Sequence, residues 1–341
     1  MQIQLTEKVT TKIQYGLRVA AGRVAAAMLA ALLAAPIAAT AQAQNYPQRP
    51  VRMIVPFGAG GSYDSIGRFF ANYLGERLGQ RVLVENRGGG GGTVGSEAAA
   101  RAAPDGYTLL FTSLSTWGIT SADAKRLTYS PEKDFTPLAI VGSSANSFVV
   151  HPSVTAASLK ELIELVRANP GKLRYCSPGV GSGPHIIGEL FRHRFKLNIQ
   201  HVPYRTGGLG IIDLLSGQIE MCISGISTVA SRVRSGQLRA LAVIGAARSA
   251  LLPEVPTMAE AGVGDFVFEI IFGMLAPAGV APEIVARVTR EIVAVTQLPE
   301  FRSRLVEFGS DPAETLTGEA FGRFMAGEAR RWREISALGG M

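Results

Sequence analysis

The sequence is poor in the residues that build metal centres, disulfide frameworks and nucleic-acid surfaces. Its 341 residues include only two cysteines and four histidines. The histidines share no ligand spacing with each other or with acidic residues, so we expect no metal site. Lys and Arg are scattered, without a basic stripe interleaved with aromatic residues. This pattern disfavours nucleic acid as a partner.

Long apolar runs are also missing, except near the N-terminus. Val24–Ala35 is rich in Ala and Leu, Pro36 ends it, and Ala41–Ala43 offers a small-x-small cleavage pattern. Basic residues precede the run at Lys8, Lys12, Arg18 and Arg23. These features predict a signal peptide over residues 1–43 and an exported protein that begins near Gln44. The alternative is a retained membrane anchor, for which the apolar run is short.

The net charge is +7, but residues 1–43 carry four basic residues and one acidic one, which leaves the exported chain near +4. This mild excess favours anionic small ligands. The two cysteines, Cys176 and Cys222, each lie in an apolar, strand-like run. Export permits a disulfide between them. We favour buried free thiols, because two cysteines do not make a framework.

Short β-rich runs alternate with amphipathic, helix-length segments. This rhythm predicts an α/β fold with parallel sheets covered by helices. The expected strands are 51–55, 82–85, 109–112, 148–150, a run ending at 176, 201–204, 219–223 and 238–244. The expected helices are 63–78, 94–102, 159–169 with Ser158 as its cap, 184–195, 209–215, 282–296, 299–308 and 317–338. Two strand–helix series followed by terminal helices predict lobe 1 over 44–144 and 268–341, and lobe 2 over 145–267.

Two glycine-rich turns stand between an expected strand and an expected helix. In Phe57–Ser62 and Gly88–Gly95, backbone amides and a helix start can converge on an anion. The first turn lacks the Gly-Lys-Ser/Thr end of a nucleotide-binding loop, and its other interpretation is a tight turn without a ligand. The second formally matches a dinucleotide fingerprint, but 109–115 lacks the acidic residue that would bind a ribose. We therefore expect no cofactor.

Two further turns, Thr112–Thr116 and Ser177–Gly183, offer hydroxyls and amides that suit a carboxylate but supply no base. Asp64 fits either an amino group on a ligand or the positive start of a helix. Ser182 and His185 suggest an alternative function, an exported hydrolase or isomerase acting on a small acid. Ser182 fails the nucleophile-elbow pattern because Val180 occupies the first glycine position.

Many short motifs together resemble the Bug-type periplasmic solute receptors, the substrate-binding proteins of tripartite tricarboxylate transporters. The resemblance covers essentially the whole exported chain. Its motifs include Val55-Pro56-Phe57-x-x-Gly60-Gly61-x-x-Asp64, Val84-Glu85-Asn86-Arg87, Ala103-Pro104-Asp105-Gly106-Tyr107, Val202-Pro203-Tyr204 and Asp213-Leu214-Leu215-x-Gly217-Gln218.

The resemblance implies two Rossmann-like lobes of periplasmic binding protein type II, joined by crossing strands, with a ligand cleft between them. It implies a periplasmic, monomeric receptor without catalytic activity, which binds a small carboxylate and delivers it to membrane transporter subunits or a sensor. The implied ligand-binding residues are Phe57, Gly58, Ala59, Gly60, Gly61, Ser62, Asp64, Gly91, Gly92, Thr93, Val94, Gly95, Ser113, Ser115, Thr116, Ser177, Gly179, Ser182, His185, Tyr204 and Ser224.

Two segments depart from the family pattern. Cys222–Gly225 stands where the family often has Asp or Asn near a strand end, and Arg205–Gly208 replaces a common Lys-Gly-Ser/Gly-like stretch. Both are expected near the distal end of the ligand, so they bear on which acid is bound.

Overall fold

The computed structural model describes residues 46–114, 117, 127–264 and 267–339. The predicted signal peptide over residues 1–43 lies outside the described residues. The elements described below all belong to one unit, Pro47–Met341. Within the described part of the chain, no helix is long and apolar enough to cross a membrane.

The first strand–helix series forms a parallel group of three strands, here called the first strand group. β1 pairs in parallel with β2 on one side and with β3 on the other. The series comprises β1 (Val51–Val55), α2 (Ser62–Leu78), β2 (Val82–Asn86), the 3₁₀ turn η1 (Gly90–Gly92), α3 (Thr93–Ala100) and β3 (Thr108–Ser113).

A second series forms the second strand group, in which β5 pairs in parallel with β6 and with β7. It comprises α5 (Leu159–Ala168), β5 (Arg174–Ser177), α6 (Gly183–Arg194), β6 (Gln200–Pro203), α7 (Gly207–Leu215), β7 (Met221–Gly225), α8 (Ile226–Arg234) and β8 (Arg239–Ile244). Local sequence explains these elements. In α5, for example, Ser158 caps the helix and Leu162 lies on its buried face.

Two antiparallel strands, β4 (Phe135–Val150) and β9 (Glu269–Pro277), connect the strand groups. β9 pairs with β3, and with β4 as far as Ala145. From Asn146 onward β4 pairs with β7 and β8. The nine-stranded sheet therefore runs β2-β1-β3-β9-β4-β7-β5-β6, with β8 on β4.

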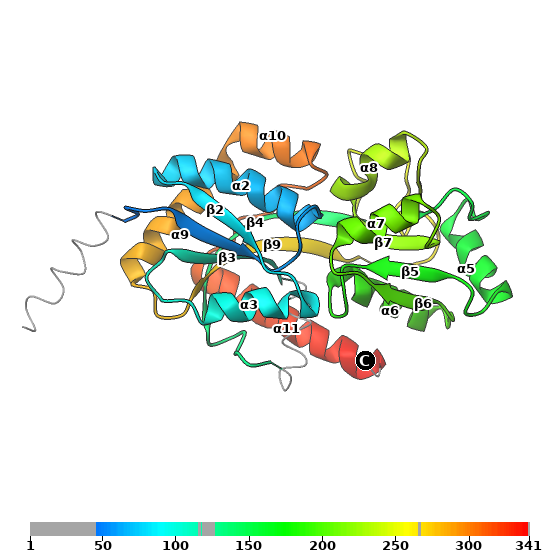
Figure 1. Cartoon of the computed structure of the whole chain (residues 1–341), viewed down its shortest axis with the longest axis horizontal. Helices are drawn as coiled ribbons and strands as arrows, with labels where there is room; N and C mark the ends of the chain where they lie inside the picture. Colours follow the sequence, from blue (N-terminus) through cyan, green and yellow to red (C-terminus); the bar gives the residue numbers. More distant parts are fainter. Residues whose placement is uncertain (1–45, 115–116, 118–126, 265–266, 340–341) are drawn as a thin grey trace, which may run out of the picture. The chain divides into compact units, whose positions relative to one another are not determined.

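The chain ends in three helices, α9 (Pro282–Gln297), α10 (Pro299–Glu307) and α11 (Gly318–Gly339). In Figure 1, α2 and α10 lie on one side of the first strand group, and α3 and α11 lie on the other. α11 contributes to two cores. Phe321 packs into the apolar cluster around Ile54 of β1, whereas Trp332 packs into the cluster around Tyr175 of β5.

Most of the expected strands and helices are present within a few residues of their predicted bounds. Three elements were missed or shortened. Only residues 148–150 of β4 were expected, and β9 and α8 were not expected at all. The sheet is consequently mixed, whereas the strand–helix rhythm predicted parallel pairing alone.

The expectation of free thiols is wrong, because Cys176 and Cys222 form a disulfide. They are register partners on the neighbouring parallel strands β5 and β7, with Cα atoms 4.5 Å apart. This separation lies within the range that a disulfide bridges. The pairing depends on the register of strands 46 residues apart in sequence, which composition and local pattern do not supply.

The disulfide should stabilise the folded chain, because it closes a loop of 46 residues. We expect the double variant Cys176→Ala/Cys222→Ala to lose about 2–4 kcal/mol of unfolding free energy in urea titrations. A reductant should destabilise the parent protein and leave the double variant unaffected. Equal unfolding midpoints for the parent with and without reductant would contradict the assignment.

Candidate ligand site

Three helices begin at glycines that line one pocket. The N-cap residues are Gly61 for α2, Gly92 for α3 and Gly225 for α8. Among the described residues, no side chain caps any of these three helices. The first amides of α2 and α8 and the positive ends of all three helix dipoles are therefore available to an anion. At α3, the amides of Gly92 and Val94 already donate to the Gly89 carbonyl, so this helix contributes mainly its dipole.

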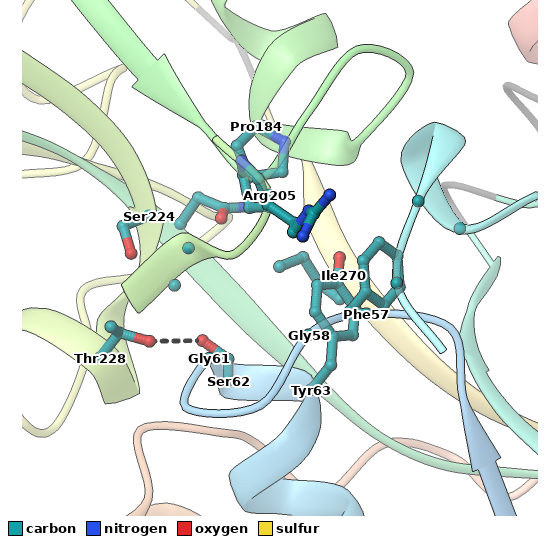
Figure 2. A pocket seen from close by; sticks show the side chains of 17 residues that line it. Phe57, Gly58, Gly61, Ser62, Tyr63, Pro184, Arg205, Ser224, Thr228 and Ile270 are labelled. Carbon is teal, nitrogen blue, oxygen red and sulfur yellow. Dashed lines mark hydrogen bonds between the residues drawn. The ribbon is translucent and has the colours of Figure 1, made fainter. Parts of the chain in front are cut away.

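The pocket is lined by residues from both strand groups (Figure 2). The crossing strands contribute Asn146 of β4 and Ile270 of β9. Two more helix starts reach it, with Pro184 in α6 and Gly207 in α7. The complete lining is Phe57, Gly58, Gly61, Ser62, Tyr63, Gly88, Gly89, Gly92, Asn146, Pro178, Pro184, Arg205, Gly207, Ser224, Gly225, Thr228 and Ile270.

The two sides of the pocket are in direct contact. The hydroxyls of Ser62 and Thr228 are hydrogen-bonded at 2.9 Å (Figure 2). A Cβ atom on Gly58 would overlap the Thr206 side chain, and one on Gly225 would overlap the Ser62 hydroxyl. The cavity volume is about 30 Å³, which is room for about two water molecules. The structure is therefore a closed arrangement of the two sides.

A polar network holds the first glycine turn in place. Asp64 is buried; it accepts the Gly60 amide at 3.0 Å and pairs with Arg68 at 2.8 Å. Arg68 also donates to the Asn86 side-chain oxygen at 2.7 Å, and Asn86 donates to the Phe57 carbonyl at 3.1 Å. Of the two interpretations of Asp64, this geometry favours the one in which it supports the helix start.

The second glycine turn packs against the first glycine turn and also against the turn that follows β5 in the second strand group. Gly89–Gly92 all have positive φ, from 56° to 135°, which favours glycine strongly. A Cβ atom on Gly88 would press on the backbone of Gly58 at 3.0 Å. A Cβ atom on Gly91 would collide with Val180 and Gly181 from the second strand group. Both turns thus border the same cavity.

The polar side chains in and next to the turn Ser177–Gly183 form hydrogen bonds within the second strand–helix series. Ser182 is fully buried, caps α6 and donates to the Gly179 carbonyl at 2.7 Å. His185 accepts the Gly181 amide through Nδ1 at 3.2 Å. The Ser177 hydroxyl is bonded to His201 Nε2 at 2.7 Å.

Burial perturbs the titrating groups behind this turn. Desolvation, followed by the nearby charge of His185, lowers the pKa of His201 to about 4. Desolvation likewise lowers the pKa of His185. The two rings lie with centroids 4.3 Å apart. For Tyr204, burial and then its 2.7 Å bond to Asp213 raise the pKa to about 12. This cluster is a structural support and not part of the pocket lining.

The predicted site residues therefore separate into three sets. Those that line the pocket are Phe57, Gly58, Gly61, Ser62, Gly92 and Ser224. Those described but not in its lining are Ala59, Gly60, Asp64, Gly91, Thr93, Val94, Gly95, Ser113, Ser177, Gly179, Ser182, His185 and Tyr204. Ser115 and Thr116 lie outside the described residues.

Sequence reasoning missed several lining residues. Tyr63 adjoins the first predicted turn. Gly88 and Gly89 lie within the second but were not among the implied binding residues, and Arg205 was noted as a departure without being assigned to the site. Asn146 and Ile270 had no local signal, because they enter the site through the long crossing strands. Among the described residues, no group of three or more His, Cys, Asp and Glu is arranged to hold a metal ion.

Asn146 is the most informative of the missed residues. Its side chain is fully buried, and within the described structure neither its nitrogen nor its oxygen has a hydrogen-bond partner. Leaving a buried polar group unsatisfied costs about 1–3 kcal/mol. A buried amide without partners beside a pocket indicates a group that is satisfied when something occupies the pocket.

Strand–helix series on both sides of two crossing strands, with helix starts meeting at a pocket, define a two-lobed α/β solute-binding protein. The chain belongs to the tripartite tricarboxylate transporter family receptors, whose profile matches residues 66–339. The predicted resemblance and fold class are both confirmed.

Individual relatives agree with this assignment. The chain is 36% identical to BugT of Bordetella pertussis over 87% of this chain and 91% of that protein. It matches the structure of the periplasmic binding protein BugD with 31% identity and a TM-score of 0.80, covering 86% of this chain and 99% of BugD.

Two matching structures contain ligands. R. palustris Rpa4515 with adipate is 29% identical, with a TM-score of 0.82 and coverage of 86% and 98%. MatC from Rhodopseudomonas palustris with bound malate is 28% identical, with a TM-score of 0.79 and coverage of 85% and 99%.

The low pKa of His201 predicts that stability falls as the pH falls. Because the folded state keeps His201 neutral down to about pH 4, whereas the unfolded chain protonates near pH 6.5, stability present above pH 6.5 is lost below it. Between pH 7 and pH 5 the unfolding free energy of the parent protein should fall. In His201→Gln we expect that fall to be smaller by about 1–2 kcal/mol. The exposed His193, changed to Gln, serves as the control and should keep the parent's decrease. An unchanged slope in His201→Gln would contradict the prediction.

The unsatisfied amide of Asn146 predicts a stabilising substitution. Asn146→Leu should raise the unfolding free energy in urea by about 1–2 kcal/mol without added ligand, because it removes two buried polar atoms while keeping the same branched side-chain skeleton. The control is the adjacent Ser147, also buried, which donates to the Ala242 carbonyl at 3.0 Å. Ser147→Ala should be destabilising. If both variants lose stability, Asn146 is satisfied in the free protein.

Proposed function

We propose that this receptor binds a small carboxylate ligand in the pocket between lobe 1 (44–144 and 268–341) and lobe 2 (145–267). Family membership supports a receptor, and the relatives with adipate and malate support a carboxylate. The separate apolar clusters around Ile54 and Tyr175 support the division into lobes.

One observation carries the proposal: three uncapped helix starts, at Gly61, Gly92 and Gly225, border one cavity that also contains the unpartnered amide of Asn146. A carboxylate supplies the negative charge that the helix starts favour and the acceptor oxygens that free amides need. No Asp or Glu is among the described lining residues to repel it.

Within lobe 1, we propose that the carboxylate is held from the turn 57–62 together with the turn that ends at Gly92. Gly60 contributes indirectly, because its amide is already bonded to Asp64. We assign Ser177, Ser182 and His185 to support of the opposing turn, since their polar atoms are bonded within lobe 2.

Ligand entry requires the lobes to separate. The cavity volume of about 30 Å³ is small for an acid of four to six carbons, so we propose that the acid enters while the lobes are apart. Contacts across the pocket, such as Ser62 with Thr228, would break on opening and re-form on closure. We propose that the closed, liganded receptor, acting as a periplasmic monomer, is the form presented to transporter subunits or a sensor.

The alternative, a hydrolase or isomerase using Ser182 and His185, is not supported. The Ser182 hydroxyl is fully buried and donates to Gly179, and the His185 ring accepts a backbone amide. In the described structure these side chains are therefore engaged elsewhere, instead of forming the nucleophile–base pair that such chemistry needs.

Ligand binding is tested by thermal unfolding of the purified protein with mono-, di- and tricarboxylates. A ligand at 100 times its dissociation constant should stabilise the protein by about 2.7 kcal/mol. Mass spectrometry of the same samples should recover the acid unchanged, and turnover would instead favour an enzyme. The absence of any shift across the acids would count against the proposal.

The position of the site is tested by a pair of glycine variants. Gly225→Ala places a methyl group against Ser62 across the pocket and should weaken binding of the stabilising acid about tenfold or more, because closure then displaces Ser62. The control, Gly327→Ala, lies in α11 with open space around the added methyl group. Its affinity should equal that of the parent. Equal affinity in Gly225→Ala would place the site elsewhere.

A further inference from the structure

Arg205 is a cation in the pocket lining that lacks a carboxylate partner. It lies in the turn between β6 and α7, and its side chain extends toward Phe57 and Ile270 (Figure 2). Across the described residues, Arg205 makes no ion pair or side-chain hydrogen bond. By contrast, Arg68, Arg174 and Arg192 each pair with an acidic side chain.

The turn that carries Arg205 is fixed in position. Thr206 caps α7 by accepting the Leu209 amide, and its side chain lies against Gly58 of lobe 1. Tyr204, on the other side, is anchored to Asp213 by a 2.7 Å hydrogen bond. The backbone of Arg205 is therefore held where the two lobes meet, while the guanidinium keeps its donors available.

The charges that line the pocket are positive. Arg205 is the sole side chain with a formal charge among the described lining residues, and the helix starts add partial positive charge. Asp64, the acid nearest the first glycine turn, is engaged by Gly60 and Arg68 and lies outside the lining. If a ligand places one carboxylate at the helix starts of lobe 1, the Arg205 guanidinium still has no negatively charged partner.

We propose that Arg205 determines specificity by binding a second carboxylate of the ligand, so that the receptor selects dicarboxylates without an ammonium group. This inference rests on the proposed function. The first carboxylate is bound from lobe 1, and Arg205 binds the second from lobe 2. Guanidinium pairs well with carboxylate because its donors match the two oxygens. An ammonium group would lie near the Arg205 cation with no acidic partner in the described lining, and like charges repel.

Calorimetry with matched acids tests this selection. Succinate and adipate carry two carboxylates, whereas butyrate and hexanoate have the same carbon counts with one. L-aspartate is succinate with an added ammonium group. In the parent protein, at least one dicarboxylate should bind about 10- to 100-fold more tightly than its monocarboxylate counterpart, and succinate should bind more tightly than aspartate.

Variants of Arg205 locate the cause of that preference. Arg205→Gln should bring the ratio of dicarboxylate to monocarboxylate affinity toward one while leaving monocarboxylate affinity unchanged. Arg205→Lys should restore part of the ratio, because it retains the charge but lacks the planar pair of donors. The control is Arg234→Gln, which removes the same charge from an exposed position on α8 outside the pocket.

The outcomes separate this inference from the proposed function. If acids bind and Gly225→Ala weakens them, but Arg205→Gln weakens both acid classes equally, the Arg205 assignment is overturned and the receptor function stands. Aspartate binding as tightly as succinate also overturns it. If none of the acids binds the parent protein, the proposed function fails and the inference fails with it.

Discussion

The positive ends of helices, gathered at one edge of each parallel strand group, are the feature on which the site depends. A parallel strand followed by a helix places that helix start beyond the carboxyl end of the strand. Two such groups meet over β4 and β9, so Gly61, Gly92 and Gly225 approach one another although they are far apart in sequence. A side-chain cap on α2 or α8 would occupy the amides that a ligand needs.

The polar side chains around the site fall into two groups: those that have a hydrogen-bond or ion-pair partner in the protein, and those that have none among the described residues. Asp64, Ser182 and His185 have partners in the protein and fix the shape of the turns. Asn146 and Arg205 have no such partners among the described residues. Polar groups without partners at a binding site are expected to cost stability when no ligand is bound.

Local pattern predicted much of this architecture. The helix after Ser158 was found because its cap and apolar spacing are both local, and the glycine turns were found because they follow clear strands. β4 was mostly missed because its middle, from Gly142 to Asn146, is small and polar, although it is buried where β9 and α10 pack closely. Asn146, and the pairing of Cys176 with Cys222, depend on long-range register, which a local pattern does not contain.

The last helix links the two cores, and this limits how the lobes can move. Phe321 is fully buried in the core of the first strand group, and Trp332, three turns later, packs on Phe268 in the other core with ring centroids 5.1 Å apart. If the two proposed lobes rotate against each other, we expect α11 to bend or the indole to move away from Phe268. The surroundings of this indole should therefore change whenever the two cores separate.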